Sequence, residues 1–361
     1  MKPATPPKAI CCSHGKTVDS STFTGRGYHG AGGRPKAPSP ARRPPGRGAC
    51  RCGNIGGVTS APFRLSPDVA AALARRAPVV ALESTVVTHG LPRPQNLELA
   101  RRLEAVVREE GAVPATVGIL GGEVRVGLTD ADLDRLAGGG ADKASTWNLA
   151  ALVAAKRDAG TTVATTLYAA HRAGIKVFAT GGIGGVHDTP FDESADLGAL
   201  AAHRVLTVCA GPKSILDARA TVERLETLGV PVVGYRSRSL AGFVVRETDV
   251  ALPAGVETPA EAAAVLLAQE ALDLPAGVVL SNPVSVGLET GDFAAYLERA
   301  RAGARSQGVT GRDTTPYLLA KLAELSGGAT MTVNLRLLEE NARLAAHVAR
   351  AYQHAAAEPA T

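Results

Sequence analysis

Aromatic residues and long hydrophobic runs are both scarce in this chain of 361 residues. Aromatic side chains make up 4% of the sequence, with a single Trp, which argues against a lectin-like β-sandwich and favours an α/β enzyme packed with Ala and Val. No apolar run reaches the roughly 18 residues that a membrane-spanning helix needs. A membrane-spanning protein is therefore not expected, whereas the 45% of hydrophobic residues suffice for a large core.

Cysteine is nearly absent after residue 60. Cys11, Cys12, Cys50 and Cys52 lie before that point, and Cys209 is alone in the rest of the chain. The spacings CC and CRC do not suit a structural zinc site, whose paired ligands are usually separated by about two to four residues. One cysteine cannot form a disulfide within the body of the protein, so we expect a reducing, cytoplasmic location.

Acidic residues are missing from the first 60 positions except for Asp19, whereas this segment holds ten Lys and Arg. The rest of the chain holds 29 basic and 33 acidic residues, so the net charge of +5 reflects the N-terminal segment alone. Eight Pro, eleven Gly and few large apolar residues in this segment predict a disordered extension over residues 1–62. It also lacks the apolar stretch of a secretory signal.

The extension is not expected to define the function. A basic arm that binds nucleic acid is one interpretation, but Phe23 and Tyr28 are its only aromatic residues, and we expect no nucleic-acid partner. The interpretation that we favour is a translation start further along, near Val58 or Val69, at a codon other than ATG. N-terminal sequencing of native protein that begins near Met1 would contradict this interpretation.

From about residue 63, buried strands alternate with helices. Continuous apolar runs predict strands at 78–84, 115–120, 176–180, 204–211, 230–235 and 276–283, and two of the helices between them are expected at 161–172 and 213–228. Runs without polar alternation are typical of parallel strands covered on both faces. We therefore predict one α/β domain over residues 63–357, with a mainly parallel sheet between two helical layers. Its C-terminus is expected to be helical over 292–307, 316–325 and 332–356.

Ligands of such sheets bind at the carboxyl ends of the strands, and polar residues follow several of the predicted strands. Glu83 follows the first strand and is a candidate general acid, because burial favours the protonated carboxyl; a helix cap or an ion pair is the alternative. Lys213 follows the strand at 204–211 and is a candidate nucleophile that forms a Schiff base with a carbonyl. A surface or phosphate-binding lysine is the alternative there, and Lys143 is a weaker candidate for a phosphate contact.

A glycine-rich segment, T-G-G-I-G-G-V-H at 180–187, follows another predicted strand. Its glycines allow backbone amides to approach a phosphate, but it fits neither the dinucleotide nor the P-loop fingerprint, and a plain turn is equally compatible. Asp192, Glu193 and Asp196 come next; their oxygens suit Mg²⁺ or Mn²⁺, and helix caps are the alternative. An acid, an amine, an anion loop and carboxylates at neighbouring strand ends together indicate a sugar-phosphate lyase or an aldolase-type enzyme.

Residues from about 63 to 355 resemble the indigoidine synthase A-like family of pseudouridine-5′-phosphate glycosidases. The stretches that carry the resemblance are long and occur in the same order, among them ALESTVVTHGLPRPQN (81–96), GAVPATVGILGG (111–122), AGIKVFATGGIGGVH (173–187), FDESADL (191–197) and TVCAGPKSILD (207–217). The resemblance implies that water reversibly cleaves pseudouridine 5′-phosphate to uracil and ribose 5-phosphate. It also implies Mn²⁺ as the cofactor and a homotrimer as the assembly.

The resemblance assigns roles to particular positions of this sequence. Lys213 matches the lysine that forms the Schiff base, Glu83 matches the proton donor, and Asp192 matches the carboxylate that binds the metal. The positions that match substrate contacts or lie in the matching glycine loop are Lys143, Val163, Thr180, His187, Ser194, Ala195, Asp196 and Asn334.

The implied chemistry explains these residue types. The bond to be broken joins two carbons, so hydrolysis through an oxocarbenium ion between paired carboxylates is a poor route. Ring opening exposes C1′, which the amine of Lys213 holds as an imine; protonation of the uracil carbon lets the base leave, and water then frees the lysine. Glu83 would assist ring opening and proton delivery. Mn²⁺ at Asp192 would orient the substrate through water, and a backbone cradle with Lys143 would bind the phosphate.

Two segments depart from the family pattern. N-P-V-S at 282–285 stands where the family commonly has N-P-I-P followed by an acid, so the region 284–291 is expected to reshape an edge of the site. A-S-T-W-N at 144–148 stands in place of a basic run. The alternatives that stay open are a related C-glycosyl or sugar-phosphate lyase with another substrate, a sugar kinase, whose anion-hole signature is missing, and an RNA-binding factor that uses the basic extension.

Overall fold

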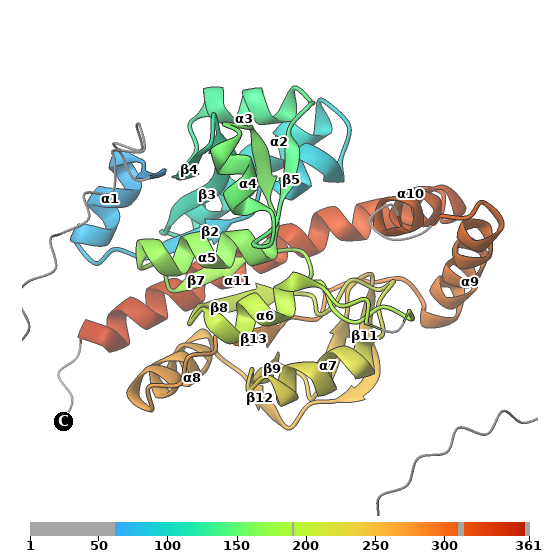
Figure 1. Cartoon of the computed structure of the whole chain (residues 1–361). Helices are drawn as coiled ribbons and strands as arrows, with labels where there is room; N and C mark the ends of the chain where they lie inside the picture. Colours follow the sequence, from blue (N-terminus) through green and yellow to red (C-terminus); the bar gives the residue numbers. More distant parts are fainter. Residues whose placement is uncertain (1–61, 190, 310–313, 358–361) are drawn as a thin grey trace, which may run out of the picture. The chain divides into compact units, whose positions relative to one another are not determined.

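The centre of the structure is a sheet of eleven strands, most of them parallel (Figure 1). The computed structural model describes residues 62–189, 191–309 and 314–357, which belong to one compact unit. The predicted extension 1–62 therefore lies outside the described residues, except for Pro62. The main path of the sheet runs through β1 (Phe63–Leu65), β4 (Glu123–Val126), β3 (Val113–Leu120), β2 (Val79–Leu82), β7 (Val177–Ala179), β8 (Leu206–Cys209), β13 (Val278–Ser281), β9 (Val232–Tyr235) and β12 (Ala254–Val256).

Parallel pairing brings the carboxyl ends of the central strands to one edge of the sheet. β2 pairs in parallel with β3 and β7, β7 pairs with β8, and β13 pairs with both β8 and β9. The sequences VVAL, LTVC and VVLS of β2, β8 and β13 are buried throughout, because both faces of these strands are covered. The mainly parallel sheet predicted from the apolar runs is confirmed.

Antiparallel pairs occur at one end of the sheet and in a separate hairpin. β3 pairs antiparallel with β4 and with β6 (Ala159–Thr161), and β6 in turn pairs in parallel with β5 (Asp142–Ala144). The hairpin consists of β10 (Ser239–Gly242) and β11 (Val245–Ala251). The antiparallel β6 matters for the site, because it turns the ends of β5 and β6 back toward the end of β2.

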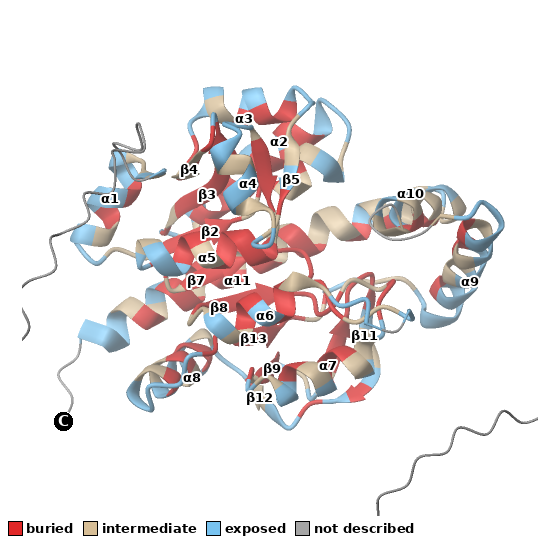
Figure 2. Ribbon diagram, viewed as in Figure 1, coloured by how far each residue is buried: buried red, intermediate tan, exposed pale blue. Residues whose placement is uncertain are grey.

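Two layers of helices cover the sheet, as Figure 2 shows by the burial of the strands between them. Val80 and Leu82 of β2 point to a core shared with one set of helices, α2 (Gln95–Glu109), α8 (Pro259–Ala271) and α11 (Ala329–Ala357). Val79 and Ala81 point to the opposite core, which is shared with α1 (Pro67–Ala74), α5 (Val163–Ala173), α6 (Ala195–Ala202) and α7 (Ala218–Thr227). Residues that alternate along a strand thus supply two cores, which confirms the predicted layers.

The C-terminal part of the described chain is helical, as predicted. α9 (Thr290–Ser306) and α10 (Thr314–Leu325) precede α11, which runs across the sheet in red in Figure 1. α11 buries twelve of its residues, and its apolar stripe forms a large part of one core. None of the described helices combines the length and the apolar character that crossing a membrane requires.

The structure corrects two predicted helices. The helix expected over 161–172 begins at Val163, because Ala159–Thr161 form strand β6. The helix expected over 213–228 begins at Ala218, after Asp217, whose Oδ1 accepts a hydrogen bond from Ala220 N at 2.8 Å. Lys213 therefore lies in the connection between β8 and α7, where its carbonyl accepts a hydrogen bond from Leu216 N at 2.9 Å in a turn, and not in the first turn of a helix.

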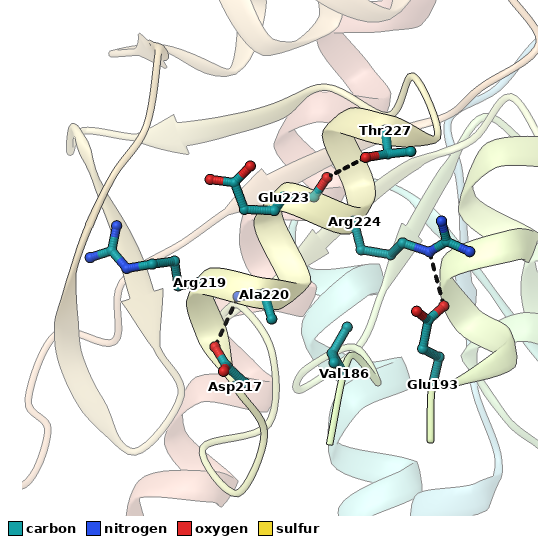
Figure 3. Close-up of a pocket in the computed structure, with 8 residues that line it drawn as sticks. All are labelled: Val186, Glu193, Asp217, Arg219, Ala220, Glu223, Arg224 and Thr227. Carbon is teal, nitrogen blue, oxygen red and sulfur yellow. Dashed lines mark hydrogen bonds and ion pairs between the residues drawn. The ribbon is translucent and has the colours of Figure 1, made fainter. Parts of the chain in front are cut away.

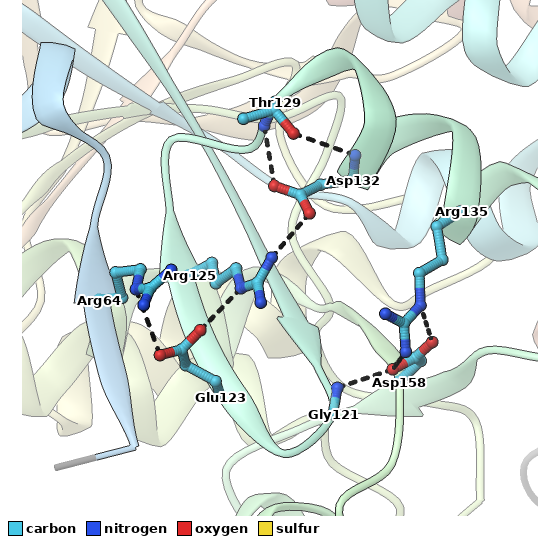
Figure 4. A network of polar contacts seen from close by, with 8 residues as sticks. All are labelled: Arg64, Gly121, Glu123, Arg125, Thr129, Asp132, Arg135 and Asp158. Carbon is cyan, nitrogen blue, oxygen red and sulfur yellow. Dashed lines mark hydrogen bonds and ion pairs between the residues drawn. The ribbon is translucent and has the colours of Figure 1, made fainter. Parts of the chain in front are cut away.

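A polar network fastens β6 to the β3–β4 turn (Figure 4). Asp158, directly before β6, accepts two hydrogen bonds from the guanidinium of Arg135, at 2.6 and 2.8 Å, and one from Gly121 N at 2.7 Å. Arg135 belongs to α3 (Asp130–Ala137), which begins with a reciprocal capping box between Thr129 and Asp132. These contacts hold β6, and through it β5 with Lys143, in a fixed position on the sheet.

Candidate active site

Polar side chains gather where the ends of β2, β5, β7 and β8 meet. Glu83 follows β2, Thr180 follows β7, and Lys213 follows β8 by four residues. The buried Ser84 connects the strands: its Oγ donates to Val117 O in β3 at 2.6 Å and accepts from Thr161 N at the end of β6 at 3.0 Å. The carboxyl ends of parallel and antiparallel segments therefore converge on one place, as expected for a sheet of this type.

Glu83 lies among groups that act on its carboxyl in opposite directions. Burial raises the pKa of Glu83 above its ordinary value, and this effect outweighs the positive charges of Lys213 and Lys143 and the hydrogen bond from Thr180 Oγ1 to Glu83 Oε1. The negative charge of Asp196 also raises the pKa of Glu83. The carboxyl thus keeps its proton to a higher pH than an exposed glutamate does, which suits a proton donor.

Lys213 is half-buried, and its backbone is hydrogen-bonded to the glycine loop. Its N–H donates to Ile183 O at 3.0 Å, and Pro212 forms a bridge with Ile183, so the connection after β8 runs alongside the glycine loop after β7. Gly211 has φ of +80°, and a Cβ there would lie 2.1 Å from Ala241 O, so only glycine allows this turn. A pocket of about 100 Å³ lies beside Lys213 and is lined in part by Ser214 and Phe293.

Lys143 completes a group of two cations and two carboxylates. The residue is exposed, yet its ammonium lies close enough to the protein for burial and the charge of Lys213 to lower the pKa of Lys143, while Asp196 and Glu83 oppose this change. His89, in a single π-helical turn over Val86–Gly90, also lies near: burial and the charge of Lys143 lower the pKa of His89. The structure thus brings together Glu83, Lys143, Lys213 and Asp196.

Asp196 ties three parts of the site together. Its side chain is 5% exposed, its Oδ1 accepts from Ala164 N at 2.9 Å, and its Oδ2 accepts from Gly184 N at 2.8 Å. It lies in the first turn of α6, behind the N-cap Ser194, whose Oγ accepts from Asp196 N, and after Ala195, the first residue of the helix. Both of its oxygens are thus engaged with backbone amides, which anchors the glycine loop to the start of α5.

Val163 is the first residue of α5, and its side chain is 1% exposed. A substrate contact at this position would therefore involve the backbone amide, which lies in the helical turn whose N–H groups have no partner within the helix.

Three hydroxyl groups beside the site residues are buried. Thr85, Thr162 and Ser214 have buried hydroxyl oxygens without a hydrogen-bond partner in the described part of the chain. Sequence reasoning missed these three, although each lies within two residues of a predicted site residue.

The glycine loop over 180–187 is built for close packing. The amide of Ile183 donates to Gly211 O, that of Gly184 to Asp196, and that of Val186 to Thr221 Oγ1. A Cβ on Gly184 would lie 2.1 Å from Ser194 Oγ. These three amides have acceptors within the protein, whereas the described hydrogen bonds include none from the amides of Gly182 and Gly185, so both interpretations of this loop stay open.

The half-buried His187 ends the glycine loop and is joined to the exposed Asp192 by a backbone hydrogen bond. His187 N donates to Asp192 O at 2.9 Å, and Asp192 N donates to Thr189 O at 3.1 Å. The carboxyl of Asp192 is exposed, and no group of three or more His, Cys, Asp or Glu in the described residues forms a metal cage. A single exposed carboxylate still fits Mn²⁺ or Mg²⁺, since such hard cations bind through one or two carboxylates and keep several waters.

Asn334 lies in α11, and the described hydrogen bonds do not link it to the charged group around Glu83. A different asparagine of the same helix reaches the site: Asn341 Nδ2 donates to Thr180 O at 2.8 Å. Sequence reasoning missed Asn341. Its signal is a polar residue inside the apolar stripe of α11, between Leu338 and Leu344.

The region 284–291, where a departure from the family pattern is expected to reshape the site, is attached to α11 at Ser285 and Val286. Glu340 accepts hydrogen bonds from the backbone and the hydroxyl of Ser285, and Arg336 donates to Val286 O at 3.2 Å. The polar Ser285 therefore has a partner that a proline would lack at its nitrogen. These contacts link the edge of the site to the long helix that carries Asn334 and Asn341.

Two further features lie outside the group around Glu83. Burial raises the pKa of the Cys209 thiol to about 12, so this cysteine is not a nucleophile at neutral pH. A hollow of about 540 Å³ runs along α7 (Figure 3), where Glu193 and Arg224 face each other in an ion pair of 2.9 Å. Its lining contains none of Glu83, Lys143 and Lys213.

Comparisons with known proteins show which family this chain belongs to. The family described as indigoidine synthase A like protein matches residues 68–351. The pseudouridine-5′-phosphate glycosidase of Thermus thermophilus is 59% identical over 276 residues, which cover 76% of this chain and 98% of that protein. The pseudouridine-5′-phosphate glycosidase of Sorangium cellulosum is 49% identical over 294 residues, which cover 80% of this chain and 92% of that protein.

Solved structures share the fold. The prealnumycin C-glycosynthase AlnA, in complex with ribulose 5-phosphate, matches with a TM-score of 0.77 and 40% identity over 82% of this chain and 99% of that one. An indigoidine synthase A-like protein of Thermotoga maritima matches with a TM-score of 0.74 and 35% identity over 81% of this chain and 96% of that one. The chain therefore belongs to the indigoidine synthase A-like family.

Proposed function

We propose that this protein is a glycosidase that reversibly cleaves pseudouridine 5′-phosphate to uracil and ribose 5-phosphate. The observation that carries the proposal is the meeting of Glu83, Lys213 and Lys143 at one edge of the sheet, with burial raising the pKa of Glu83. Relatives at 59% and 49% identity are named for this activity. An acid, an amine and a second cation are the groups that the cleavage of a phosphorylated C-glycoside requires.

Lys213 is the proposed nucleophile. Its unprotonated amine attacks C1′, the bond between C1′ and the ring oxygen breaks, and that oxygen takes the proton of Glu83. The ionised Glu83 takes the extra proton from the new ammonium nitrogen and gives it to the uracil carbon. The bond between C1′ and this carbon then breaks, its electron pair stays with uracil, and the nitrogen lone pair forms the protonated imine at C1′. Water adds to the imine carbon, and the amine leaves as ribose 5-phosphate is released, which regenerates Lys213.

The phosphate is proposed to lie near Lys143 and the first turn of α5. Lys143 supplies a positive charge, and the amide of Val163 lies in the part of the helix that attracts anions. The buried hydroxyls of Thr85, Thr162 and Ser214 supply further hydrogen-bonding groups around the site. Because the amides of Ile183, Gly184 and Val186 have acceptors within the protein, we assign these residues of the glycine loop the task of placing Thr180 and Lys213.

Asp192 is the proposed ligand of Mn²⁺, and His187 lies in the same turn. The exposed carboxylate holds the ion together with water, and the ion, when bound, supplies positive charge that orients polar groups of the substrate. The homotrimer and the cytoplasmic location are proposed on the same footing, from the resemblance and from the cysteine content respectively.

A second candidate activity is that of a related C-glycosyl or sugar-phosphate lyase with another substrate. The observation in its favour is the match to a C-glycosynthase that was solved with ribulose 5-phosphate, at 40% identity. Both candidates use a five-carbon sugar phosphate and differ in the group at C1′. Replacing pseudouridine 5′-phosphate by other C-glycosides in the same assay distinguishes them.

The experiment that tests the proposal measures uracil release from pseudouridine 5′-phosphate by chromatography, with Mn²⁺ and with a chelator. We expect release by the wild type with Mn²⁺ and none above background by Lys213→Ala. The matched control is Lys321→Ala, since Lys321 lies on α10 and pairs with Glu324. Release by Lys213→Ala at the wild-type rate would contradict the nucleophile, and no release by folded wild type would contradict the substrate.

A further inference from the structure

Asn341 is a buried polar residue in an otherwise apolar part of α11. It is 0% exposed, and Leu337, Leu338 and Leu344 around it belong to the core. Burying an amide side chain without hydrogen bonds costs free energy, so each bond that it makes is informative. The bonds of Asn341 lead to the active site.

The amide nitrogen and the amide oxygen of Asn341 have different partners. Its Nδ2 donates to Thr180 O at 2.8 Å and to Gly181 O at 3.3 Å, and its Oδ1 accepts from Asn282 Nδ2 at 2.9 Å. Two carbonyl partners fix which atom is the nitrogen, because carbonyls accept only. Asn282 follows β13 and donates its N–H to Cys209 O at 2.8 Å, so the network joins the ends of β7, β8 and β13.

The backbone around Thr180 is also held by a sheet hydrogen bond and by the packing of α11. Thr180 N donates to Val208 O at 3.1 Å, and a Cβ on Gly181 would lie 3.2 Å from Leu338 Cδ2. α11 thus packs directly on the peptide that carries Thr180. Thr180 thus links two groups: its carbonyl oxygen accepts from Asn341, and its hydroxyl donates to Glu83.

We propose that Asn341 is a positioning residue of the active site: it holds the backbone of Thr180, and thereby the hydroxyl that orients the carboxyl of Glu83. The inference rests on the proposed role of Glu83 as proton donor. Asn341 itself does not touch the reacting groups. It acts through Thr180, and Asn282 holds it in the orientation that this requires.

Loss of the Asn341 amide should change the pKa of Glu83 in one direction. The groups that act on Glu83 are Lys213, Lys143, Asp196 and the Thr180 hydroxyl. The hydroxyl donates to the ionised carboxylate and so lowers its pKa, and its loss raises the pKa further. Asn341→Leu, which keeps the size of the side chain and removes the amide, is expected to raise the titration midpoint of Glu83 by about one pH unit. Thr180→Val is expected to do the same.

The test follows the carboxyl of Glu83 by infrared difference spectra over pH, with Glu83→Gln as the reference, and needs no substrate. Failure to cleave pseudouridine 5′-phosphate therefore leaves this test intact. The double variant of Asn341→Leu with Thr180→Val is the decisive sample, because groups that act in series do not add. We expect its midpoint to equal that of Thr180→Val alone.

Leu344→Ala is the control for a merely structural effect, since Leu344 is 6% exposed on the same helix and has no polar contact to lose. It is expected to lower stability without moving the midpoint. With substrate, Asn341→Leu is expected to lower kcat about tenfold, a fraction of the factor of about 10² to 10⁴ that a positioned acid contributes, and to leave KM within about twofold.

A second variant keeps the test open if Asn341→Leu does not fold. Asn282→Ala removes the outer partner of Asn341 and is expected to move the Glu83 midpoint in the same direction by a smaller amount. The inference is overturned if the Asn341→Leu midpoint matches that of Leu344→Ala, or if the shifts of Asn341→Leu and Thr180→Val add in the double variant. An unmoved midpoint in a folded Asn282→Ala would equally count against it.

Discussion

Replacing Asp196 should lower the free energy of unfolding more than replacing an exposed acidic residue does. Its two oxygens accept from Ala164 N at 2.9 Å and Gly184 N at 2.8 Å, and the residue is 5% exposed. Asp196→Ala therefore leaves two buried N–H groups without acceptors. These belong to α5 and to the glycine loop, so both the helix start and the loop lose their shared anchor.

The magnitude follows from the number and type of bonds. A hydrogen bond to a charged group contributes about 1.5–3 kcal/mol, so Asp196→Ala is expected to lower the free energy of unfolding by about 3–6 kcal/mol. Asp196→Asn keeps one acceptor oxygen and is expected to lose about 2–3 kcal/mol. Asp188 is the matched control, because its carboxyl is exposed in an ion pair with the half-buried Arg301, and Asp188→Asn should change the free energy by less than about 1 kcal/mol.

The assay is equilibrium unfolding in urea, followed by circular dichroism at one fixed protein concentration, because assembly makes stability depend on concentration. The order of stability should be wild type and Asp188→Asn first, then Asp196→Asn, then Asp196→Ala. An Asp196→Ala protein within about 1 kcal/mol of the wild type would refute the reasoning, since the two amides would then have other acceptors or access to water.

Two further predictions concern the proton donor and the metal. Because burial raises the pKa of Glu83 above its ordinary value of 4.5, its ionised form destabilises the fold, and this loss of stability appears as pH rises from the unfolded-state pKa through the raised one. The melting temperature of Glu83→Gln minus that of the wild type should therefore grow with pH. The kcat of the wild type should fall at high pH as Glu83 loses its proton, and the kcat of Glu83→Gln should lack this fall. A difference in melting temperature that is constant with pH would contradict the burial argument. Asp192→Asn should require more Mn²⁺ for uracil release and should bind Mn²⁺ more weakly in calorimetry. Asp188→Asn, four residues away in the same turn region, should change neither property. Equal Mn²⁺ affinities of the two variants would show that Asp192 is not a ligand of the metal.

The sequence was sufficient to predict which strand ends meet. Glu83 and Lys213 each follow a continuous apolar run, and parallel strands place such residues at a common edge. The structure brings these two side chains within electrostatic reach of one another, with Lys143 as a third. Their placement therefore follows from local patterns, whereas their chemical roles stay predictions that rest on the resemblance.

The short strands were beyond the reach of periodicity. β5 and β6 have three residues each, and the sequence of β6, Ala-Gly-Thr, contains no large apolar side chain. Their pairing with each other and with β3 comes from tertiary contacts, including the bonds of Asp158 to Arg135 and Gly121. The predicted helix that began at residue 161 accordingly included the end of a strand.

The connection after β8 shows how an apolar pattern misleads. Ile215 and Leu216 follow Lys213 and extend the apolar period of α7 backwards, so the sequence predicted a helix from residue 213. The N-cap bond of Asp217 sets the true start. Asp217 N also donates to Val186 O at 2.9 Å, which attaches the end of this connection to the glycine loop. Such a partner is distant in the sequence and cannot be inferred from local propensity.

Asn341 illustrates a functional residue that pattern reasoning overlooks. A polar residue in an apolar stripe can be a tolerated defect or a deliberate contact, and the sequence does not distinguish the two. Its partners Thr180, Gly181 and Asn282 come from two other strand ends. Only the packing of α11 on the sheet brings them together.

The central claim is that Lys213 holds the sugar phosphate as an imine. The most direct measurement mixes the protein with ribose 5-phosphate, reduces the mixture with borohydride, and locates the trapped sugar by mass spectrometry of peptides. The account predicts one adduct, on Lys213, that is absent from Lys213→Ala and unchanged in Lys321→Ala. An adduct on Lys143 instead, or none on folded wild-type protein that releases uracil, would contradict it.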